Sequence, residues 1–120
     1  MKESHHAISY IEISVADMSR ARDFYGRAFG WQFNDYGPEY SGIQAPDGNG
    51  EVGGLGVGRG TGPGGVIALL YSEDLDASAA AVEGAGGTII DAPYAYPGGR
   101  RFIFGDVDGN VLGVYQPSDG

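Results

Sequence analysis

The sequence predicts an α+β fold in which two βαβββ modules form one cupped mixed sheet with a helix behind each half. Strands with an alternating apolar pattern and two helical stripes between an Asp and a Gly support this prediction. The landmarks of the two halves recur 57 positions apart: Asp17 and Asp74, Gly30 and Gly87, Phe33 and Ile90. Because a unit of about 60 residues buries its sheet poorly alone, we expect the two units to share a sheet.

The first module, over about residues 7–60, begins with a strand at residues 7–15. Its side chains alternate between two faces, with Ile11, Ile13 and Val15 on one face and Ile8, Tyr10, Glu12 and Ser14 on the other. Asp17 is suited to cap the following helix, and Gly30 to end it. The next strand is expected to start at Trp31.

The second module, over about residues 64–117, has a strand at Val66 to Tyr71, a helix capped by Asp74 and a further strand from Thr88. Residues 93–97 indicate a loop. The closing hairpin joins residues 101–106 to residues 111–116 across a two-residue turn at Asp108-Gly109. In this register Phe102, Phe104, Gly113 and Tyr115 share the cavity face, and Ile103, Leu112 and Val114 share the helix face. The whole chain, residues 1–120, is interpreted as one domain.

Composition restricts the function. The 120 residues contain 16 acidic and 7 basic side chains, a net charge of −9, and no cysteine. Nucleic acids and anionic membranes are therefore poor partners, and disulfides and thiolate metal sites are excluded. No segment has the apolar length of a signal peptide or a membrane span, so we expect a cytoplasmic protein. The acidity would attract a cationic ligand, or serves solubility alone.

Three segments together resemble the vicinal oxygen chelate superfamily, which includes glyoxalases, bleomycin-resistance proteins and extradiol dioxygenases. They are the run Ile13-Ser-Val-Ala-Asp17 leading to Asp23-Phe-Tyr-Gly-Arg-Ala-Phe-Gly-Trp31, the Asp74-Leu75-Asp76 segment, and the ending Arg101-Phe-Ile-Phe-Gly-Asp-Val-Asp-Gly-Asn-Val-Leu-Gly113. The resemblance spans about residues 7–116 and looks closest to the bacterial glyoxalase-related branch. It implies paired βαβββ modules, a cupped sheet that holds a small molecule, and a homodimer.

The resemblance also implies where a metal would bind. Metal-dependent members carry ligands seven residues before each helix-capping Asp and three residues after the Asn of the last turn. Here those positions are Tyr10, Ile67 and Gly113. A divalent ion needs three or four converging lone-pair donors, and isoleucine and glycine side chains offer none. We therefore expect no metal and no cofactor. The His5-His6 pair is interpreted as a frayed terminus rather than a metal site.

The candidate ligand-binding residues are those expected to line the cup: Tyr10, Glu12, Leu69, Phe102, Phe104 and Tyr115. Three roles for Glu12 stay open. The carboxylate shapes the cavity, accepts hydrogen bonds from a cationic or hydroxyl-rich ligand, or acts as a general base with Tyr10 as neutral donor. Arg100 and Arg101 form a basic spot that either anchors an anion or balances nearby acids.

The function that we expect is metal-free, bleomycin-resistance-like binding of a small organic molecule, an antibiotic or a metabolite, with a cationic guest as one case. The alternative is a glyoxalase-like or dioxygenase-like enzyme, a lyase or isomerase, with Glu12 as a metal-independent base. A third alternative is a structural module whose cup is filled by its own side chains. Fold alone does not decide among them.

Overall fold

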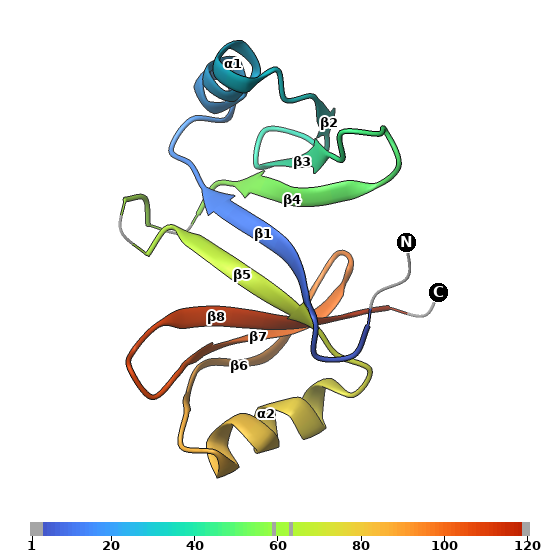
Figure 1. Ribbon diagram of the computed structural model, residues 1–120. Coiled ribbons are helices and arrows are strands. Elements are labelled where there is room, and N and C mark those ends of the chain that lie inside the picture. The colour runs from blue at the N-terminus through green and yellow to red at the C-terminus, as the bar shows by residue number, and fades with distance from the viewer. Residues whose placement is uncertain (1–3, 59, 63, 119–120) are drawn as a thin grey trace. The chain divides into compact units, whose positions relative to one another are not determined.

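The computed structural model describes residues 4–58, 60–62 and 64–118, which form two helices and eight strands. The elements in order are β1 (Ile8–Ser14), α1 (Met18–Phe29), β2 (Phe33–Asp35), β3 (Tyr40–Gln44), β4 (Glu51–Gly56), β5 (Val66–Tyr71), α2 (Leu75–Gly84), β6 (Thr88–Tyr96), β7 (Gly99–Gly105) and β8 (Val111–Pro117). Each half follows a βαβββ order, so the predicted α+β fold class with two such modules is confirmed (Figure 1).

The chain divides into two units. The α1 unit comprises residues 10–67, and its strands lie in the order β2-β3-β4-β1. The α2 unit comprises the described residues 4–9 and 68–118, and its strands lie in the order β5-β8-β7-β6. In both units the first strand is parallel to the last one, and the remaining pairs are antiparallel.

Both helices begin where the sequence predicts. The Asp17 carboxylate accepts a hydrogen bond from the Arg20 N–H at 2.9 Å, which satisfies one of the free amides of the first turn of α1. Gly30 ends α1 with a left-handed φ of 73°, a conformation that glycine adopts without a Cβ clash. Helix α2 ends at Gly84 with Ala85 as its C-cap, slightly before the predicted stop at residues 86–87.

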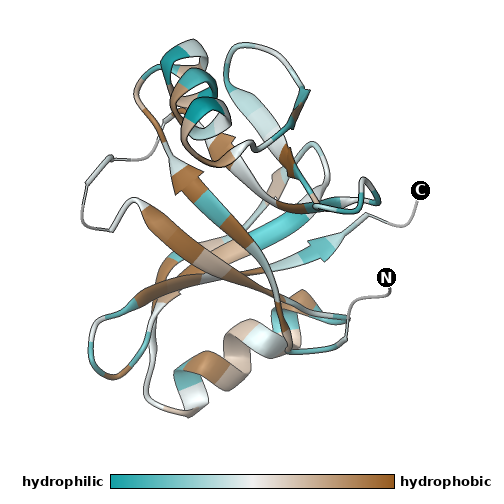
Figure 2. Cartoon of the chain, turned by 45° about the horizontal axis from the view of Figure 1, so that its top comes forward, coloured by the Kyte–Doolittle hydropathy of each residue, from teal (hydrophilic) through white to brown (hydrophobic). Residues whose placement is uncertain are grey.

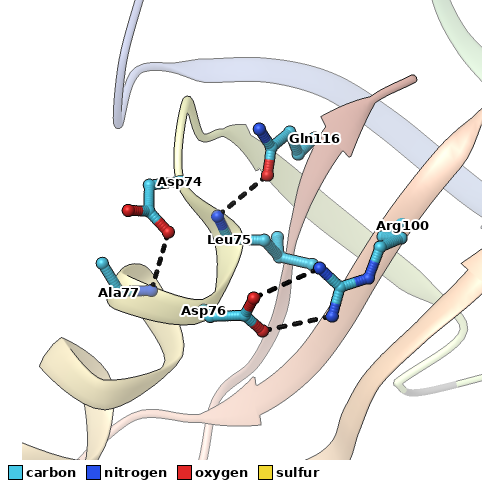
Figure 3. A network of polar contacts seen from close by, with 6 residues as sticks. All are labelled: Asp74, Leu75, Asp76, Ala77, Arg100 and Gln116. Carbon is cyan, nitrogen blue, oxygen red and sulfur yellow. Dashed lines mark hydrogen bonds and ion pairs between the residues drawn. The ribbon is translucent and has the colours of Figure 1, made fainter. Parts of the chain in front are cut away.

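The start of α2 is held by side chains from other elements (Figure 3). Asp74 accepts from the Ala77 N–H at 3.1 Å, and the Leu75 N–H donates to Gln116 Oε1 on β8 at 3.0 Å. Arg100 on β7 forms two hydrogen bonds, of 3.1 and 3.3 Å, to the Asp76 carboxylate. Arg100 therefore balances an acid, the second of the two roles that the sequence left open for it.

Each helix covers one face of the sheet in its own unit. The α1 core contains Val15, Met18, Ile43 and Leu55, with Ile13, Ala21, Tyr25 and Phe33 packed around them. The α2 core contains Leu75, Ala79, Phe102 and Val114, with Leu70, Val82, Ile89 and Phe104 around them. The open face of a unit is the face of its sheet opposite its helix. Figure 2 shows β5 as mostly hydrophobic, whereas β1 alternates between hydrophobic and hydrophilic residues.

The closing hairpin corrects the predicted register. Phe102 pairs with Val114 and Phe104 with Leu112, one residue away from the expected pairing. The cause is the Asp106 carboxylate, which accepts from the N–H groups of Asp108 and Asn110, each at 2.9 Å, and enlarges the turn to three residues. Because a one-residue change of register moves side chains relative to their partners, the expected faces also change. Phe102 and Phe104 face α2, not the open face.

Residues 93–96 were expected in a loop, and this expectation is wrong. They belong to β6, which pairs with β7 from Thr88 to Tyr96 with register shifts between Ile89 and Asp91 and between Asp91 and Tyr94. The irregular pairing accommodates Pro93, because proline donates no hydrogen bond to a neighbouring strand. Tyr94 and Tyr96 are therefore held beside β7 rather than in a turn.

Candidate functional site

The open face of the α1 unit carries its concentration of polar side chains. Tyr10 and Glu12 come from β1, Tyr40 and Gln44 from β3, and Asn34 from β2. Glu51 joins them because the pairing of β3 with β4 shifts after Ile43: Ile43 pairs with Gly53, but Gln44 pairs with Glu51. Leu55 faces α1, and simple alternation along β4 would put Glu51 on the same face as Leu55. The bulge instead turns the Glu51 side chain to the open face.

Two neutral donors hold the Glu51 carboxylate. Its Oε2 accepts hydrogen bonds from Asn34 Nδ2 at 2.8 Å and from Tyr36 Oη at 2.5 Å. The side chain of Gln44 in turn donates to Asn34 Oδ1 at 2.9 Å, which orients the Asn34 amide. The carboxylate lies against β3 at Gly42, where a Cβ would overlap it. The glycine therefore leaves the space that the Glu51 carboxylate occupies.

Tyr10 and Tyr40 share a hydrogen bond between their hydroxyl groups. Burial raises the pKa of Tyr10 far above its usual value, and the hydrogen bond to Tyr40 and the charges of Glu51 and Glu12 add to the increase. Tyr10 is therefore a neutral hydroxyl over the physiological pH range. A Cβ at Gly54 would overlap Tyr40 Oη, so this glycine leaves room for the tyrosine pair.

Glu12 is buried on the same face, with 8% of its surface exposed. Its position opposite Gly54 in the parallel pair of β1 and β4 places it beside the tyrosine pair. We refer to Tyr10, Glu12, Tyr36, Tyr40 and Glu51 as the glutamate–tyrosine face. The face combines two carboxylates with three phenol groups. Such a set favours a ligand that donates hydrogen bonds or carries a positive charge.

The open face of the α2 unit is different, because hydrocarbon covers its middle. Leu69 pairs with Gly113, and a Cβ at Gly113 would overlap Leu69 Cδ2 and lie 3.2 Å from Ile103 Cδ1. Leu69 is 3% exposed and Ile103 is fully buried. The space above Gly113 is therefore filled by two aliphatic side chains.

Beyond Leu69 the same open face carries aromatic rings and one arginine. Arg101 Nε donates to Tyr94 Oη at 2.7 Å, and its guanidinium lies 5.7 and 5.4 Å from the ring centres of Tyr94 and Tyr96. Tyr115, which pairs with Arg101, shares a 2.6 Å hydrogen bond with Ser9 Oγ and packs edge to face against Tyr71. These contacts order Tyr115 on the open face, where the sequence predicted it.

A match to a family model identifies the fold family. The model of the glyoxalase/bleomycin resistance protein/dioxygenase superfamily matches residues 7–114. The chain belongs to this superfamily. The resemblance stated from the sequence is thereby confirmed.

Solved structures similar to this superfamily member share its fold. A NAD-dependent benzaldehyde dehydrogenase from Legionella pneumophila has a TM-score of 0.72 at 17% identity, covering 91% of this chain and 98% of its own. Methylmalonyl-CoA epimerase from Mycobacterium tuberculosis has a TM-score of 0.68 at 14% identity, covering 98% and 93%. The Mn(II)-bound glyoxalase from Novosphingobium aromaticivorans has a TM-score of 0.64 at 23% identity, covering 96% and 40%.

An uncharacterized protein from Mycolicibacterium smegmatis is 40% identical over 55 residues. The match covers 46% of this chain and 47% of that protein, so it spans about half of each. The name of that protein indicates no activity.

The residues at the superfamily's expected metal positions do not fit a metal ion. Tyr10 is a half-buried neutral hydroxyl, the Ile67 side chain has no donor atom, and the space at Gly113 is taken by Leu69. Within the residues that the structure describes, no group of three or more His, Asp or Glu side chains could hold an ion. Neither described helix has the length and apolar content to cross a membrane.

The predicted site residues fall into three groups. Tyr10 and Glu12 share the open face of the α1 unit, whereas Leu69 and Tyr115 lie on the open face of the α2 unit. Phe102 and Phe104 belong to the α2 core, and Phe102 is fully buried there, so both leave the candidate site. The correction follows from the hairpin register.

Sequence reasoning missed Glu51, Asn34 and Tyr36. Alternation counted back from Leu55 assigns Glu51 to the helix side, and the bulge that reverses it depends on pairing with β3. Tyr36 lies in the turn after β2, where the Asp35 carboxylate accepts from the Gly37 N–H at 2.9 Å. The Asp35-Tyr36-Gly37 turn chemistry is visible in the sequence and was the one signal that could have indicated that Tyr36 is held in place.

The terminal histidines are not frayed as expected. His5 Nδ1 accepts from the Glu73 N–H at 2.9 Å, and His6 Nε2 lies 2.9 Å from Ser78 Oγ. The His6 N–H also donates to the Tyr71 carbonyl at 2.7 Å. The two rings stack with centres 3.7 Å apart. Both histidines therefore fasten the start of the chain to the beginning of α2.

Proposed function

We propose that this superfamily member binds a small organic molecule on its open faces without a metal ion. The observation that carries the proposal is the glutamate–tyrosine face, in which hydroxyl and carboxylate groups occupy the surface around Tyr10, the expected metal position. Such convergent polar groups beside aromatic rings are typical of small-molecule sites. Tyr10 and Glu12 are the proposed contact residues on the open face of the α1 unit, and Leu69 and Tyr115 are those on the open face of the α2 unit, each face being considered by itself.

The proposal is tested by calorimetry and thermal unfolding of the purified protein. The probes are bleomycin, kanamycin and a set of aromatic amines, alcohols and acids, each titrated with and without EDTA. We expect at least one probe to bind equally in both conditions and to raise the unfolding temperature. Stoichiometric nickel, zinc, iron or manganese in elemental analysis, or binding that EDTA abolishes, contradicts the proposal.

A second candidate function is a metal-independent proton transfer. It is favoured by one observation, the buried Glu12 beside a Tyr10 hydroxyl that stays neutral. In such a step the Glu12 carboxylate removes a proton next to a carbonyl group while the Tyr10 hydroxyl hydrogen-bonds the developing oxyanion, and return of the proton completes an isomerisation. This is the enzyme alternative, a glyoxalase-like isomerase.

Methylmalonyl-CoA in D₂O provides the assay for this candidate, because the epimerase with a similar fold is named for that compound. Deuterium incorporation beside the thioester is followed by NMR. Exchange above the uncatalysed rate that Glu12→Gln abolishes supports the proton-transfer function. Exchange equal to the uncatalysed rate would show that the protein does not catalyse proton transfer on methylmalonyl-CoA.

The homodimer and the cytoplasmic location stay predictions. Light scattering at several protein concentrations measures whether the chain forms a homodimer.

A further inference from the structure

We propose that the glutamate–tyrosine face binds an organic ammonium group, a protonated amine or a quaternary ammonium, with Glu51 as its counter-ion. The inference rests on the proposed small-molecule function and names the chemical class of the ligand. Three features of the α1 unit carry it: the Glu51 carboxylate, the neighbouring aromatic rings, and the neutral character of the groups that hold Glu51 among the described residues.

The Glu51 carboxylate takes part in none of the ion pairs among the residues that the structure describes. Its two hydrogen-bond partners, the Asn34 amide and the Tyr36 hydroxyl, are neutral donors, and both bind Oε2. The arginine side chains of the described ion pairs instead contact other acids, Asp23, Asp35 and Asp76. Two hydrogen bonds orient the carboxylate but leave its charge to attract a cation.

The rings beside Glu51 favour an organic cation over a bare metal ion. The ring centres of Tyr36 and Tyr40 lie 6.2 Å apart with an angle of 28° between the planes. An ammonium group is attracted to the negative face of an aromatic ring, and its alkyl substituents gain contacts with the ring carbons. A divalent ion instead needs several converging lone-pair donors, whereas the Asn34 amide and the Tyr36 hydroxyl meet the Glu51 carboxylate with their N–H and O–H groups.

The same face disfavours an anion. Glu12 and Glu51 both act on Tyr10 through their negative charge, which shows that the two carboxylates belong to one electrostatic environment. A carboxylate or phosphate ligand would be repelled by both. The neutral Tyr10 hydroxyl adds no charge of its own, and it can hydrogen-bond a polar substituent of the ligand.

Three probes of almost equal shape test the inference: 2-phenylethylamine, 2-phenylethanol and phenylacetate, which are cationic, neutral and anionic at pH 7. Affinities are measured by NMR titration of the full chain at low and high salt. We expect the amine to bind at least tenfold more tightly than the alcohol and phenylacetate to bind most weakly. The preference should decrease with added salt, because salt screens an accessible ion pair.

The decisive variant is Glu51→Gln, which keeps the shape of the side chain and removes its charge. We expect it to lose the tenfold preference for the amine and to keep the affinity for the alcohol. Glu39→Gln is the matched control, since Glu39 is an exposed acid of the same unit and its removal changes the net charge equally. Glu39→Gln should retain the preference.

Tyr36→Leu provides a second measurement in case Glu51→Gln destabilises β4. Tyr36 lies outside the strands and is 61% exposed, so its replacement leaves the core intact. The variant should bind the amine several-fold more weakly than the natural chain does. Equal affinities for amine and alcohol, a preference that survives Glu51→Gln, or no binding of the amine each overturn the ammonium inference. Binding of the alcohol alone overturns the inference and leaves the proposed small-molecule function standing.

Discussion

The α1 unit and the α2 unit share one order of elements but carry different open faces. Positions 57 residues apart hold Tyr10 and Ile67, and Glu12 and Leu69. In β1 these positions carry a phenol and a carboxylate, whereas in β5 both are buried hydrocarbons. The α2 unit fills its open face with Leu69 and Ile103, and the α1 unit leaves room with Gly42 and Gly54 for polar groups.

The difference shows that the repeated landmarks determine the scaffold and not the chemistry. Asp17 and Asp74 cap their helices in the same way in both units. The side chains between the landmarks are free to diverge, because an open face is not constrained by packing against a helix. The proposed function therefore depends mainly on the α1 unit, whereas the α2 unit supplies an apolar and aromatic surface.

The strongest test of the two faces is Phe102→Ala. Phe102 is fully buried in the α2 core, so removal of its ring should decrease the free energy of unfolding by about 3–5 kcal/mol. Urea unfolding measures the change. Phe24→Ala is the control, because Phe24 is 57% exposed and its loss should have a small effect. If Phe102→Ala were as stable as the control variant, Phe102 would not be part of the α2 core and would instead lie on the open face.

The filled centre of the α2 unit is tested by Gly113→Glu, which introduces the carboxylate that metal-dependent relatives are expected to have. The new side chain would overlap Leu69 and place a charge among hydrocarbons, so we expect a loss of about 3 kcal/mol. The melting temperature reports this loss. Gly84→Glu adds the same charge at a position where a Cβ would have open space around it, and it should be tolerated.

The shared landmarks are tested by Asp17→Ala and Asp74→Ala. Each substitution removes one side-chain acceptor of a first-turn N–H, at 2.9 Å in α1 and 3.1 Å in α2. We expect each to cost about 1 kcal/mol of stability. Chemical denaturation of both variants measures whether the two caps are equivalent. A loss confined to one variant would show that the repeat is not energetically symmetric.

The smallest expected effect concerns pH and the turn at Asp106. The Asn110 side chain, with the N–H groups of Asn110 and Asp108, lowers the pKa of the Asp106 carboxyl below its usual range. The unfolded chain therefore binds the proton more readily, so this contribution is complete above the ordinary carboxyl pKa of about 3.9 and is lost as the pH falls through the lower native value.

Denaturation at about pH 6 and about pH 3 measures this contribution, because the two values lie on either side of the ordinary carboxyl pKa. In Asp106→Asn the decrease in stability between the two should be smaller than in the natural chain. Asp108→Asn serves as the control, because Asp108 is an exposed acid of the same turn and its removal changes the net charge equally. If stability decreased equally between the two pH values in the Asp106 and Asp108 variants, the hydrogen bonds of the Asp106 carboxylate would not be the cause of the pH dependence.

Much of the fold could be predicted because the signals are local. The bounds of β5 match the predicted strand at residues 66–71, and both caps lie at the predicted Asp residues. A cap or a helix stop depends on residues within one turn, so the sequence contains what is needed to recognise it. The candidate site was predicted less completely: the alternation placed Tyr10 and Glu12 together on one face of β1, as the structure does, but it did not bring Glu51 to that face.

The sequence by itself determined the α+β class, the two modules and the positions of their helices, because alternation, caps and glycine stops act over a few residues. The tertiary structure decided which side chains share an open face. One bulge beside Ile43 brings Glu51 to Tyr36, and one extra turn residue after Asp106 directs Phe102 toward α2. Both outcomes depend on hydrogen bonds between strands, and a shift of one residue there reverses the face of a side chain.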